Sequence, residues 1–431
     1  MYLKDTSILN KNIESFKKIH IIGISGIGLS ALAHILHSKD IQITGSTNAF
    51  NKQTKKLKDK GVLINLHDQE NLSKDTQLVI ITQEIPSDNP ELQKALDLNI
   101  PVITYPQAVG MLLHGYKKVI TISGTHGKST STAMLVTVLD KLNIPFNAII
   151  GTDVVSIGYK NYHIDDSSDI FVVEACEYMD AFLNYNPYIN LTTNVEWDHF
   201  DFFTSKEQYL ETFQKLLDKS QFNIVNIDLK LAERLTNIDI KYSKSQSHSL
   251  NLSITGDHNR TNALGVKHIC EKLGIHESDF NRAILEFTHS ARRMEIVSQT
   301  ENQTIYTDYG HHPTEVKVTL QALREKHPDS KICLFFQPHQ YNRTIQTLAL
   351  FKDAFNNADT VIIPDIYDAR DTLEDKLQMN TDKLIANIEH PNIFNGESLD
   401  NCKLKFAELT KNHDIVMVMG AGNITKIIDY Y

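Results

Sequence analysis

Short apolar runs and helical repeats alternate along most of the chain. Residues 18–22 (KIHII) read as a short strand, and after a glycine-rich turn Leu29, Leu32 and Leu36 recur at helical spacing. Four further apolar runs follow: IQITG, VLINL, LVIIT and IPVIT. Strands that alternate with helices indicate a parallel sheet with crossover helices, so we expect a doubly wound domain here.

The same alternation begins twice more, at KVITISGTHGKST near residue 120 and at KICLFFQPHQYNRT near residue 331. The 431 residues exceed what one hydrophobic core normally organises. We therefore predict an α/β protein of three domains: a Rossmann-like N-terminal domain (1–115), a central P-loop ATPase domain with a mostly parallel sheet (116–287), and a Rossmann-like C-terminal domain (288–431).

Composition narrows the class of protein without naming a function. Hydrophobic residues make up 41% and charged residues 22%, which is ordinary for a folded globular chain. The formal charge of −10 comes without a basic block, so nucleic acid is not an expected partner. The four cysteines lie far apart, and the chain starts without an apolar signal core, so we expect a cytoplasmic protein without a membrane segment.

The sequence GTHGKST carries the strongest chemical signal. Gly124 and Gly127 free the backbone to point N–H groups at a phosphate, Lys128 adds a positive charge, and hydroxyl residues begin the next helix. The general nucleotide loop has a further glycine where this chain has Ile122. A simple glycine turn that caps a helix is the alternative, but the lysine and hydroxyls favour a phosphate loop.

The first glycine cluster, at residues 23–28, is a weaker signal. It fits a diphosphate at a helix N-terminus but does not match G-x-G-x-x-G in order. The segment after the next strand, TGSTNAF, has no acidic residue for a nicotinamide ribose. This absence counts against a nicotinamide cofactor.

Acidic residues and a histidine follow two predicted strands near the phosphate loop. Glu174 ends one strand, with Glu177 three residues later, and His199 follows another strand together with further acids. Oxygen and imidazole ligands at the carboxyl ends of parallel strands are suitable for Mg²⁺. Each one alone could equally be a solvated loop residue or a helix cap, but together they predict a metal site.

The last third of the chain holds two more polar segments at strand ends. YTDYGHHPTE contains Asp308 and a histidine pair, and FQPHQYNRT contains His339 and Arg343. Adjacent histidines in an extended segment point in opposite directions, and no third soft ligand is near, so a structural zinc is disfavoured. Arg343 is a candidate anion clamp.

Taken in order, these motifs resemble the Mur ligases, the ATP-dependent amino-acid-adding enzymes of bacterial cell-wall synthesis. The resemblance runs through nearly the whole chain: GISGIGLSALA, DNPELQKALDLNIPVI, SGTHGKSTSTAML, EACEYMDAFL, TNVEWDHFDFF, GDHNRTNAL, ARRMEI, DYGHHPTEV, FQPHQYNRT and GAGNI. The alanine-adding branch is the most similar.

The resemblance implies roles for particular residues. The N-terminal domain would bind the sugar nucleotide through Gly23, Ser25, Gly26, Ile27, Gly28 and Ser46. ATP would be bound by Gly124, Thr125, His126, Gly127, Lys128, Ser129, Thr130, Asn259, Asn262, Arg292 and Asp308. The metal ligands would be Ser129, Glu174 and His199, the amino acid would contact Tyr309, His311 and Arg343, and the catalytic residues would be Lys128, Glu174 and His199.

The activity so implied is ligation of L-alanine to the carboxylate of UDP-N-acetylmuramate, with ATP, one or two Mg²⁺ ions and an acyl-phosphate intermediate. A monomer or a weak homodimer is expected. Some positions depart from the alanine branch: Gln340 replaces a usual arginine, Gly310 a usual alanine and Thr47 a usual acid. The alternatives left open are a recycling ligase that attaches a tripeptide, a nicotinamide oxidoreductase and a non-catalytic nucleotide-sugar sensor.

Overall fold

The computed structural model describes residues 6–428, so the outermost ends of the predicted terminal domains, 1–5 and 429–431, lie outside the described residues. The chain forms two compact units. The first comprises the residues up to Val195 together with Leu210–Tyr242 and Gly265–Ala283, and the second comprises Glu196–Tyr209, Ser243–Leu264 and the residues from Ile284 onward.

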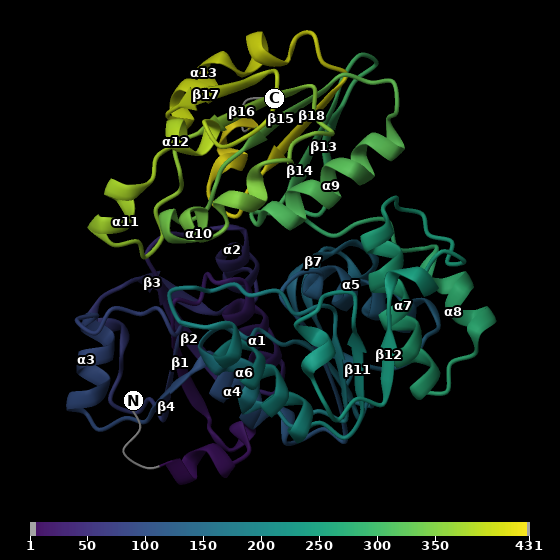
Figure 1. Ribbon diagram of the computed structural model, residues 1–431. Coiled ribbons are helices and arrows are strands. Elements are labelled where there is room, and N and C mark those ends of the chain that lie inside the picture. Colours follow the sequence, from purple (N-terminus) through teal and green to yellow (C-terminus); the bar gives the residue numbers. More distant parts are fainter. Residues whose placement is uncertain (1–5, 429–431) are drawn as a thin grey trace. The chain divides into compact units, whose positions relative to one another are not determined.

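The first unit begins with a five-stranded parallel sheet in the order β3-β2-β1-β4-β5 (Figure 1). Its strands are β1 (Lys18–Ile22), β2 (Gln42–Thr47), β3 (Leu63–Leu66), β4 (Leu78–Ile81) and β5 (Val102–Thr104). Its helices are α1 (Ile27–Ser38), α2 (Lys52–Lys58), α3 (Pro90–Asp97) and α4 (Tyr105–Leu113). The strand order reverses beside β1, and in such sheets ligands bind at the carboxyl ends of the strands at that point.

The same unit contains a seven-stranded sheet in the order β12-β11-β10-β6-β9-β7-β8, parallel except for β8. Its strands are β6 (Lys118–Ser123), β7 (Asn147–Val154), β8 (Lys160–His163), β9 (Ile170–Glu174), β10 (Ile189–Thr192), β11 (Asn223–Asn226) and β12 (Ile240–Tyr242). The helices between and after these strands are α5 (Lys128–Lys141), α6 (Lys206–Lys219), α7 (Asp257–Lys272) and α8 (Glu277–Ile284).

The antiparallel hairpin of β7 and β8 connects the two sheets of the first unit. The Asn161 side chain donates to the backbone oxygen of Ile27 at 2.6 Å, and the Tyr162 ring stacks on His34 with centroids 4.3 Å apart. Both partners belong to α1. The sequence analysis did not anticipate this hairpin.

The second unit is built on a six-stranded sheet in the order β13-β14-β18-β15-β16-β17. Its strands are β13 (Glu295–Gln299), β14 (Thr304–Asp308), β15 (Ile332–Phe336), β16 (Thr360–Pro364), β17 (Ile393–Glu397) and β18 (Ile415–Met419), with only the β13–β14 pair antiparallel. Its helices are α9 (Pro313–Lys326), α10 (Tyr341–Gln346), α11 (Leu373–Gln378), α12 (Thr381–Ile385) and α13 (Leu399–Thr410).

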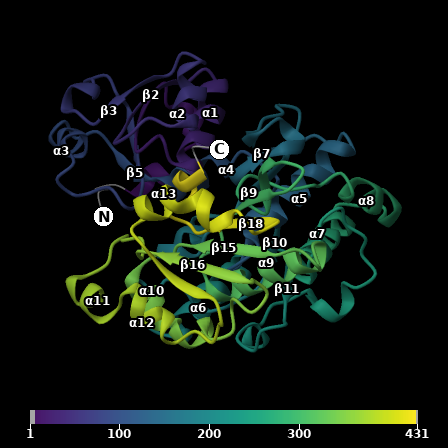
Figure 2. The same cartoon turned by 90° about the horizontal axis from the view of Figure 1, so that it is seen from above.

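Alternating side chains of the third sheet build two apolar layers, one on each face. Leu334 and Phe336 of β15 pack with residues of α9 and α12, whereas Cys333 and Phe335 pack with Phe406 of α13. Helices therefore cover both faces of a mostly parallel sheet, as the sequence predicted (Figure 2). Within residues 6–428, no helix has the length and apolar character needed to cross a membrane.

Candidate active site

The phosphate-loop sequence forms a turn between β6 and α5. Gly124 and Gly127 have φ angles of +126° and +80°, a region that favours glycine. A Cβ on Gly124 would lie 2.1 Å from Oγ1 of Thr193, so no side chain fits there. The backbone approaches the end of β10 closely, and α5 starts at Lys128 with its N-terminal N–H groups toward the turn.

Asn194, two residues after the end of β10, fixes the centre of this loop. Its side chain accepts a hydrogen bond from the His126 N–H at 2.9 Å and donates one to the His126 oxygen at 2.9 Å. The Thr193 hydroxyl also donates to that oxygen. The loop is therefore held by side chains of the neighbouring strand, a role that the sequence analysis did not assign.

The ammonium of Lys128 lies back across its own loop. It donates to the backbone oxygens of Gly124 and Thr125, the latter at 3.0 Å, and pairs with Oε2 of Glu177 at 3.0 Å. Burial disfavours the charged lysine, but the negative charges of Glu177 and Glu174, together with other nearby groups, outweigh burial and raise the pKa of Lys128. Lys128 therefore stays positively charged, as binding of a phosphate requires.

The carboxylate of Glu174 lies beside Ser129, the second residue of α5. Its Oε1 accepts from the Ser129 hydroxyl at 2.9 Å, and its Oε2 accepts from the Gly151 N–H at 3.0 Å. A Cβ on Gly151 would lie 2.3 Å from Oε2, so a side chain here would displace the carboxylate. A hydroxyl and a carboxylate so close to a phosphate loop are hard oxygen ligands that fit Mg²⁺. The third predicted ligand, His199, belongs to the second unit.

The glycine cluster after β1 forms a second turn at a strand end. The N–H groups of Gly23 and Ile24 donate to the Ser46 oxygen at the end of β2, and Gly26 is the N-cap of α1. A Cβ on Gly28 would lie 2.6 Å from the Tyr105 ring. The predicted sugar-nucleotide residues of 23–28 therefore occupy the carboxyl edge of the sheet, where the strand order reverses.

Ser46 and Ser25 differ in how their hydroxyls are used. Ser46 is fully buried, and its hydroxyl contacts Glu91 and, at 2.8 Å, Nδ1 of His67. The Ser25 hydroxyl accepts from Thr47 at 2.7 Å and lies on the turn itself. Thr47 thus supports the turn at the position where the related branch carries an acid.

In the second unit, Asp308 closes a tight turn at the end of β14. Its two carboxylate oxygens accept from the N–H groups of Met294 at 2.9 Å and Gly310 at 2.7 Å. Burial raises the pKa of Asp308, against the opposing charge of Arg293. The Arg292 guanidinium lies over the Tyr309 ring, 4.8 Å from its centroid, and donates to the Gly420 oxygen. The predicted residues Arg292, Asp308 and Tyr309 are thus brought together.

The remaining predicted amino-acid contacts lie next to this turn. The rings of Tyr309 and His311 are 5.8 Å apart, and those of His311 and His339 are also 5.8 Å apart. Burial lowers the pKa of His311 to about 3 and that of His339 to about 4. Both imidazoles are therefore neutral near pH 7 and can accept hydrogen bonds.

Arg343 forms a buried ion pair that the sequence did not predict. Its Nε donates to Oδ1 of Asp198 at 2.9 Å, and its Nη1 lies 3.3 Å from Nδ1 of His339. Burial alone would raise the pKa of Asp198, but the Arg343 charge together with the neighbouring His199 and His312 holds it well below its ordinary value. The neighbouring Gln340 has φ +73° and donates its amide to the Ala369 oxygen at 2.9 Å, so it stabilises a loop.

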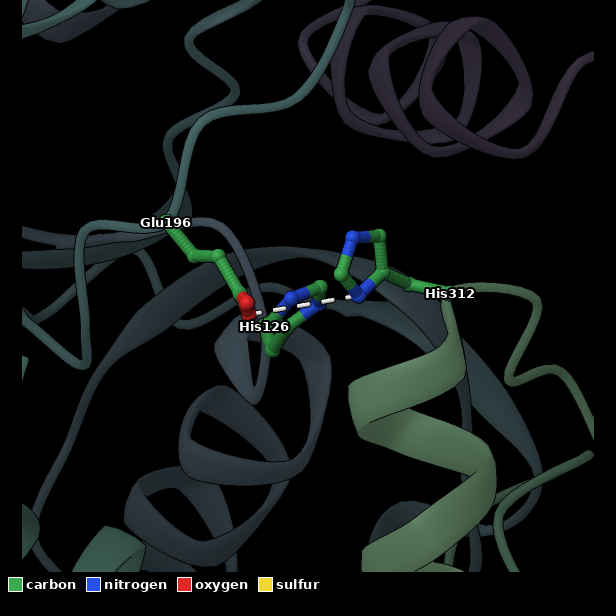
Figure 3. Close-up of side chains that lie close together, drawn as sticks. All are labelled: His126, Glu196 and His312. Atoms are coloured by element: carbon green, nitrogen blue, oxygen red, sulfur yellow. Dashed lines mark ion pairs between the residues drawn. The ribbon is translucent and has the colours of Figure 1, made fainter. Parts of the chain in front are cut away.

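The histidine pair divides between two roles. His312 is the N-cap of α9, and its Nδ1 lies 3.9 Å from Oε2 of Glu196, while Thr314 donates to Oε1 of Glu196 at 3.0 Å (Figure 3). His311 points instead toward the Tyr309 and His339 rings. The two side chains therefore diverge, as expected for adjacent residues.

The predicted adenine contacts lie in the first turns of α7. Asn259 donates its side-chain amide to the Thr255 oxygen at 2.7 Å, and Asn262 is buried one turn later. These residues and His199 belong to the second unit.

A phosphate loop that ends a parallel strand, with a charged lysine and a carboxylate beside a helix N-terminal hydroxyl, defines a nucleotide-binding α/β enzyme. Three family descriptions match the chain in order: "Mur ligase family, catalytic domain" over residues 18–117, "Mur ligase middle domain" over 122–241, and "Mur ligase, glutamate ligase domain" over 292–422. The chain belongs to the Mur ligase family.

Relatives in this family are similar over nearly their whole length. The UDP-N-acetylmuramate–L-alanine ligase of Clostridium botulinum is 34% identical over 96% of this chain and 97% of that protein, and the one of Caldicellulosiruptor bescii is 33% identical with the same shares. The crystal structure of UDP-N-acetylmuramate-alanine ligase from Thermotoga maritima superposes with a TM-score of 0.81 at 25% identity, covering 95% of this chain and 97% of that one. A murein peptide ligase from Psychrobacter arcticus shares the fold, with a TM-score of 0.71 at 19% identity over 95% and 97%.

Proposed function

We propose that this chain ligates L-alanine to the carboxylate of UDP-N-acetylmuramate with consumption of ATP, in peptidoglycan precursor synthesis. The main observation behind the proposal is the phosphate loop. Lys128 and the hydrogen-bonded pair of Ser129 and Glu174 lie together at the carboxyl edge of the second sheet. Relatives that bear this activity in their names are similar over 96% of the chain. Membership in the family makes the protein an ATP-dependent, amide-bond-forming ligase.

Residues 124–130 would bind the nucleotide phosphates through backbone N–H groups, and Lys128 would balance the charge of the phosphoryl group as it moves. Ser129 and Glu174 would hold Mg²⁺, with His199 at a second ion. The metal would offset negative charge on the phosphates and so allow an anionic carboxylate to approach. Asn259 and Asn262 would contact the adenine, and Arg292 and Asp308 would complete the ATP site.

The N-terminal sheet would bind the sugar nucleotide at the turn of residues 23–28, with Ser46 supporting it from β2. The backbone N–H groups at the start of α1 suit a diphosphate. The substrate carboxylate would first become an acyl phosphate, and the amine of the amino acid would then displace the phosphate. Exclusion of water by protein side chains would protect this reactive species from hydrolysis.

Tyr309, His311 and Arg343 would surround the amino acid. A neutral His311 can accept a hydrogen bond from an amino group, and a guanidinium is the usual partner of a carboxylate. Because Arg343 is already paired with Asp198, an incoming carboxylate would have to share or displace that partner. We further propose domain boundaries near residues 115 and 287, a cytoplasmic location, and a monomer or weak homodimer.

One observation keeps a second candidate in view. Gln340, in place of the arginine usual in the alanine branch, has its amide bound to Ala369 and does not supply a second positive charge beside Arg343. A site without an arginine at position 340 would suit a larger amine such as a tripeptide, which is the substrate of the recycling branch. The nicotinamide oxidoreductase has no comparable support in the family membership.

The test measures ADP release by the purified chain with Mg²⁺ and ATP, omitting one substrate at a time. We expect release only when UDP-N-acetylmuramate and L-alanine are both present, and we expect Lys128→Ala to lower the rate at least about a hundredfold, because it removes charge stabilisation of the transferring phosphoryl group. Normal turnover by Lys128→Ala would contradict the assignment of the loop. Release that depends on sugar nucleotide and tripeptide, and not on L-alanine, would move the chain to the recycling branch.

A further inference from the structure

The phosphate-loop lysine has a buried acidic partner that the proposed chemistry does not use. Glu177 is fully buried, and its Oε2 lies 3.0 Å from Nζ of Lys128. Glu177 follows β9 by three residues, in the same segment that carries Glu174. One strand end therefore supplies a carboxylate to each of two neighbouring residues, Glu174 to Ser129 and Glu177 to Lys128.

The lysine has three N–H donors, and each of them has a protein acceptor. Two go to the backbone oxygens of Gly124 and Thr125, and the third goes to Glu177. For a phosphate oxygen to become a partner, Lys128 must give up one of these three contacts. Which of the three contacts is given up depends on the free-energy cost of breaking each one.

Release of Glu177 would separate two opposite charges that lie 3.0 Å apart in the protein interior. Breaking such a buried ion pair costs considerably more than losing one hydrogen bond to a backbone oxygen. The loop oxygens of Gly124 and Thr125 are therefore the contacts that a phosphate replaces. The ion pair persists, and Nζ pivots about Glu177 as it turns toward the ligand.

We propose that Glu177 is a positioning residue that directs the Lys128 ammonium toward the terminal phosphate of a bound nucleoside triphosphate. The inference rests on the proposed function to the extent that the loop binds ATP. It differs from a purely structural role, because a structural carboxylate would support the loop equally for any nucleotide. A positioning role concerns the terminal phosphate, which ADP lacks.

Measuring the affinity for two nucleotides distinguishes a positioning role from a structural role without an activity assay. Titration calorimetry of the full chain with Mg²⁺ would compare the Kd of a non-hydrolysable ATP analogue, AMP-PNP, with that of ADP, in the absence of other substrates. We expect the unaltered chain to prefer AMP-PNP. Glu177→Ala should reduce this preference about tenfold while the Kd of ADP changes less than about threefold, since a lysine contact to one phosphate is lost.

Glu177→Gln preserves the shape and one acceptor but removes the charge, and it serves as the second variant if Glu177→Ala does not fold. It should lose part of the preference. Asp180→Asn makes the same kind of change three residues further along, where the carboxylate accepts from Thr212 at 2.5 Å, and it should retain the preference.

The outcomes are distinguishable. If both Glu177 variants retain the preference for AMP-PNP, or weaken both nucleotides to the same extent, the positioning role is wrong. If Lys128→Ala also keeps the preference, or if the unaltered chain has none, the phosphate-loop assignment fails and this inference fails with it. Loss of the preference in Lys128→Ala and in Glu177→Ala, but not in Asp180→Asn, supports the proposal.

Discussion

At single positions, the room left by a missing side chain matters to the predicted site as much as charge does. Gly124 and Gly151 have no side chain, and in each case an added Cβ would collide with a group that the site needs: Thr193 for the loop and Glu174 for the predicted metal site. Only Gly124 stood out in the sequence, because it belongs to a motif. Gly151 lies within an ordinary apolar strand, and its importance depends on which strand is its neighbour in the sheet.

Gly151→Ala tests the link between this strand and the metal site. The added Cβ would lie 2.3 Å from Oε2 of Glu174 and would displace the carboxylate. Overpacking of this kind costs about 1–3 kcal/mol, so we expect the Mg²⁺ concentration for half-maximal ADP release to rise about tenfold or more. Gly158→Asn in the same hairpin is the control, because nothing lies near its Cβ and asparagine tolerates its φ of +78°. An unchanged Mg²⁺ requirement in Gly151→Ala would contradict a metal role for Glu174.

At the scale of helices and strands, hydrogen bonds of buried polar groups hold neighbouring elements together. Glu91 in the first turn of α3 is fully buried, and it accepts from Asn71 at 2.7 Å and from the Ser46 hydroxyl, with His20 of β1 at 3.7 Å. Burial alone would raise the pKa of Glu91, but His20, Ser46 and Asn71 outweigh it and lower the pKa to about 2. One carboxylate therefore connects α3 to two strands.

This shift predicts a pH-dependent contribution to stability. Glu91 has a lower pKa in the folded chain than its ordinary 4.5, so its contribution is complete above pH 4.5 and declines as the pH falls toward about 2. From the two pKa values the contribution is on the order of 3 kcal/mol. We expect Glu91→Gln to lower the melting temperature at pH 7 and the difference from the unaltered chain to shrink below pH 4.5. A difference that stays constant from pH 7 to pH 3 would exclude an ionised, stabilising Glu91.

Elements that are apolar or carry a motif could be predicted, including the edge strands β3 and β5, whereas two other edge strands could not. The apolar runs predicted β1, β6 and β15, which lie inside their sheets. The edge strands β8 and β13 were missed because they are short or have exposed positions, such as Ile296 and Val297. The phosphate loop could be predicted from its own sequence. Asn194 and Glu177 reach it from segments that follow β10 and β9, and the sheet order that places these segments beside the loop is not specified by local patterns.

At the scale of the whole molecule, the three predicted binding sites fall on three mostly parallel sheets. The strand order places a glycine turn at the carboxyl edge of the first sheet and the phosphate loop at that of the second, and Asp308 ends a strand of the third. Ligands of such sheets bind at these edges. The fold class predicted from sequence is confirmed by the similarity to the Thermotoga maritima ligase, while the roles of individual residues remain predictions.

The main proposal is that L-alanine is the incoming amine, and competition between candidate amines tests it. The purified chain would be incubated with UDP-N-acetylmuramate, ATP and Mg²⁺. The amines would be an equimolar mixture of L-alanine, glycine, L-serine and the tripeptide L-alanyl-γ-D-glutamyl-diaminopimelate. The products would be identified and quantified by mass spectrometry. We expect the L-alanine adduct to exceed the others together by about tenfold, since one methyl group or hydroxyl changes selectivity by roughly that factor or more. A tripeptide adduct as the main product would contradict the account.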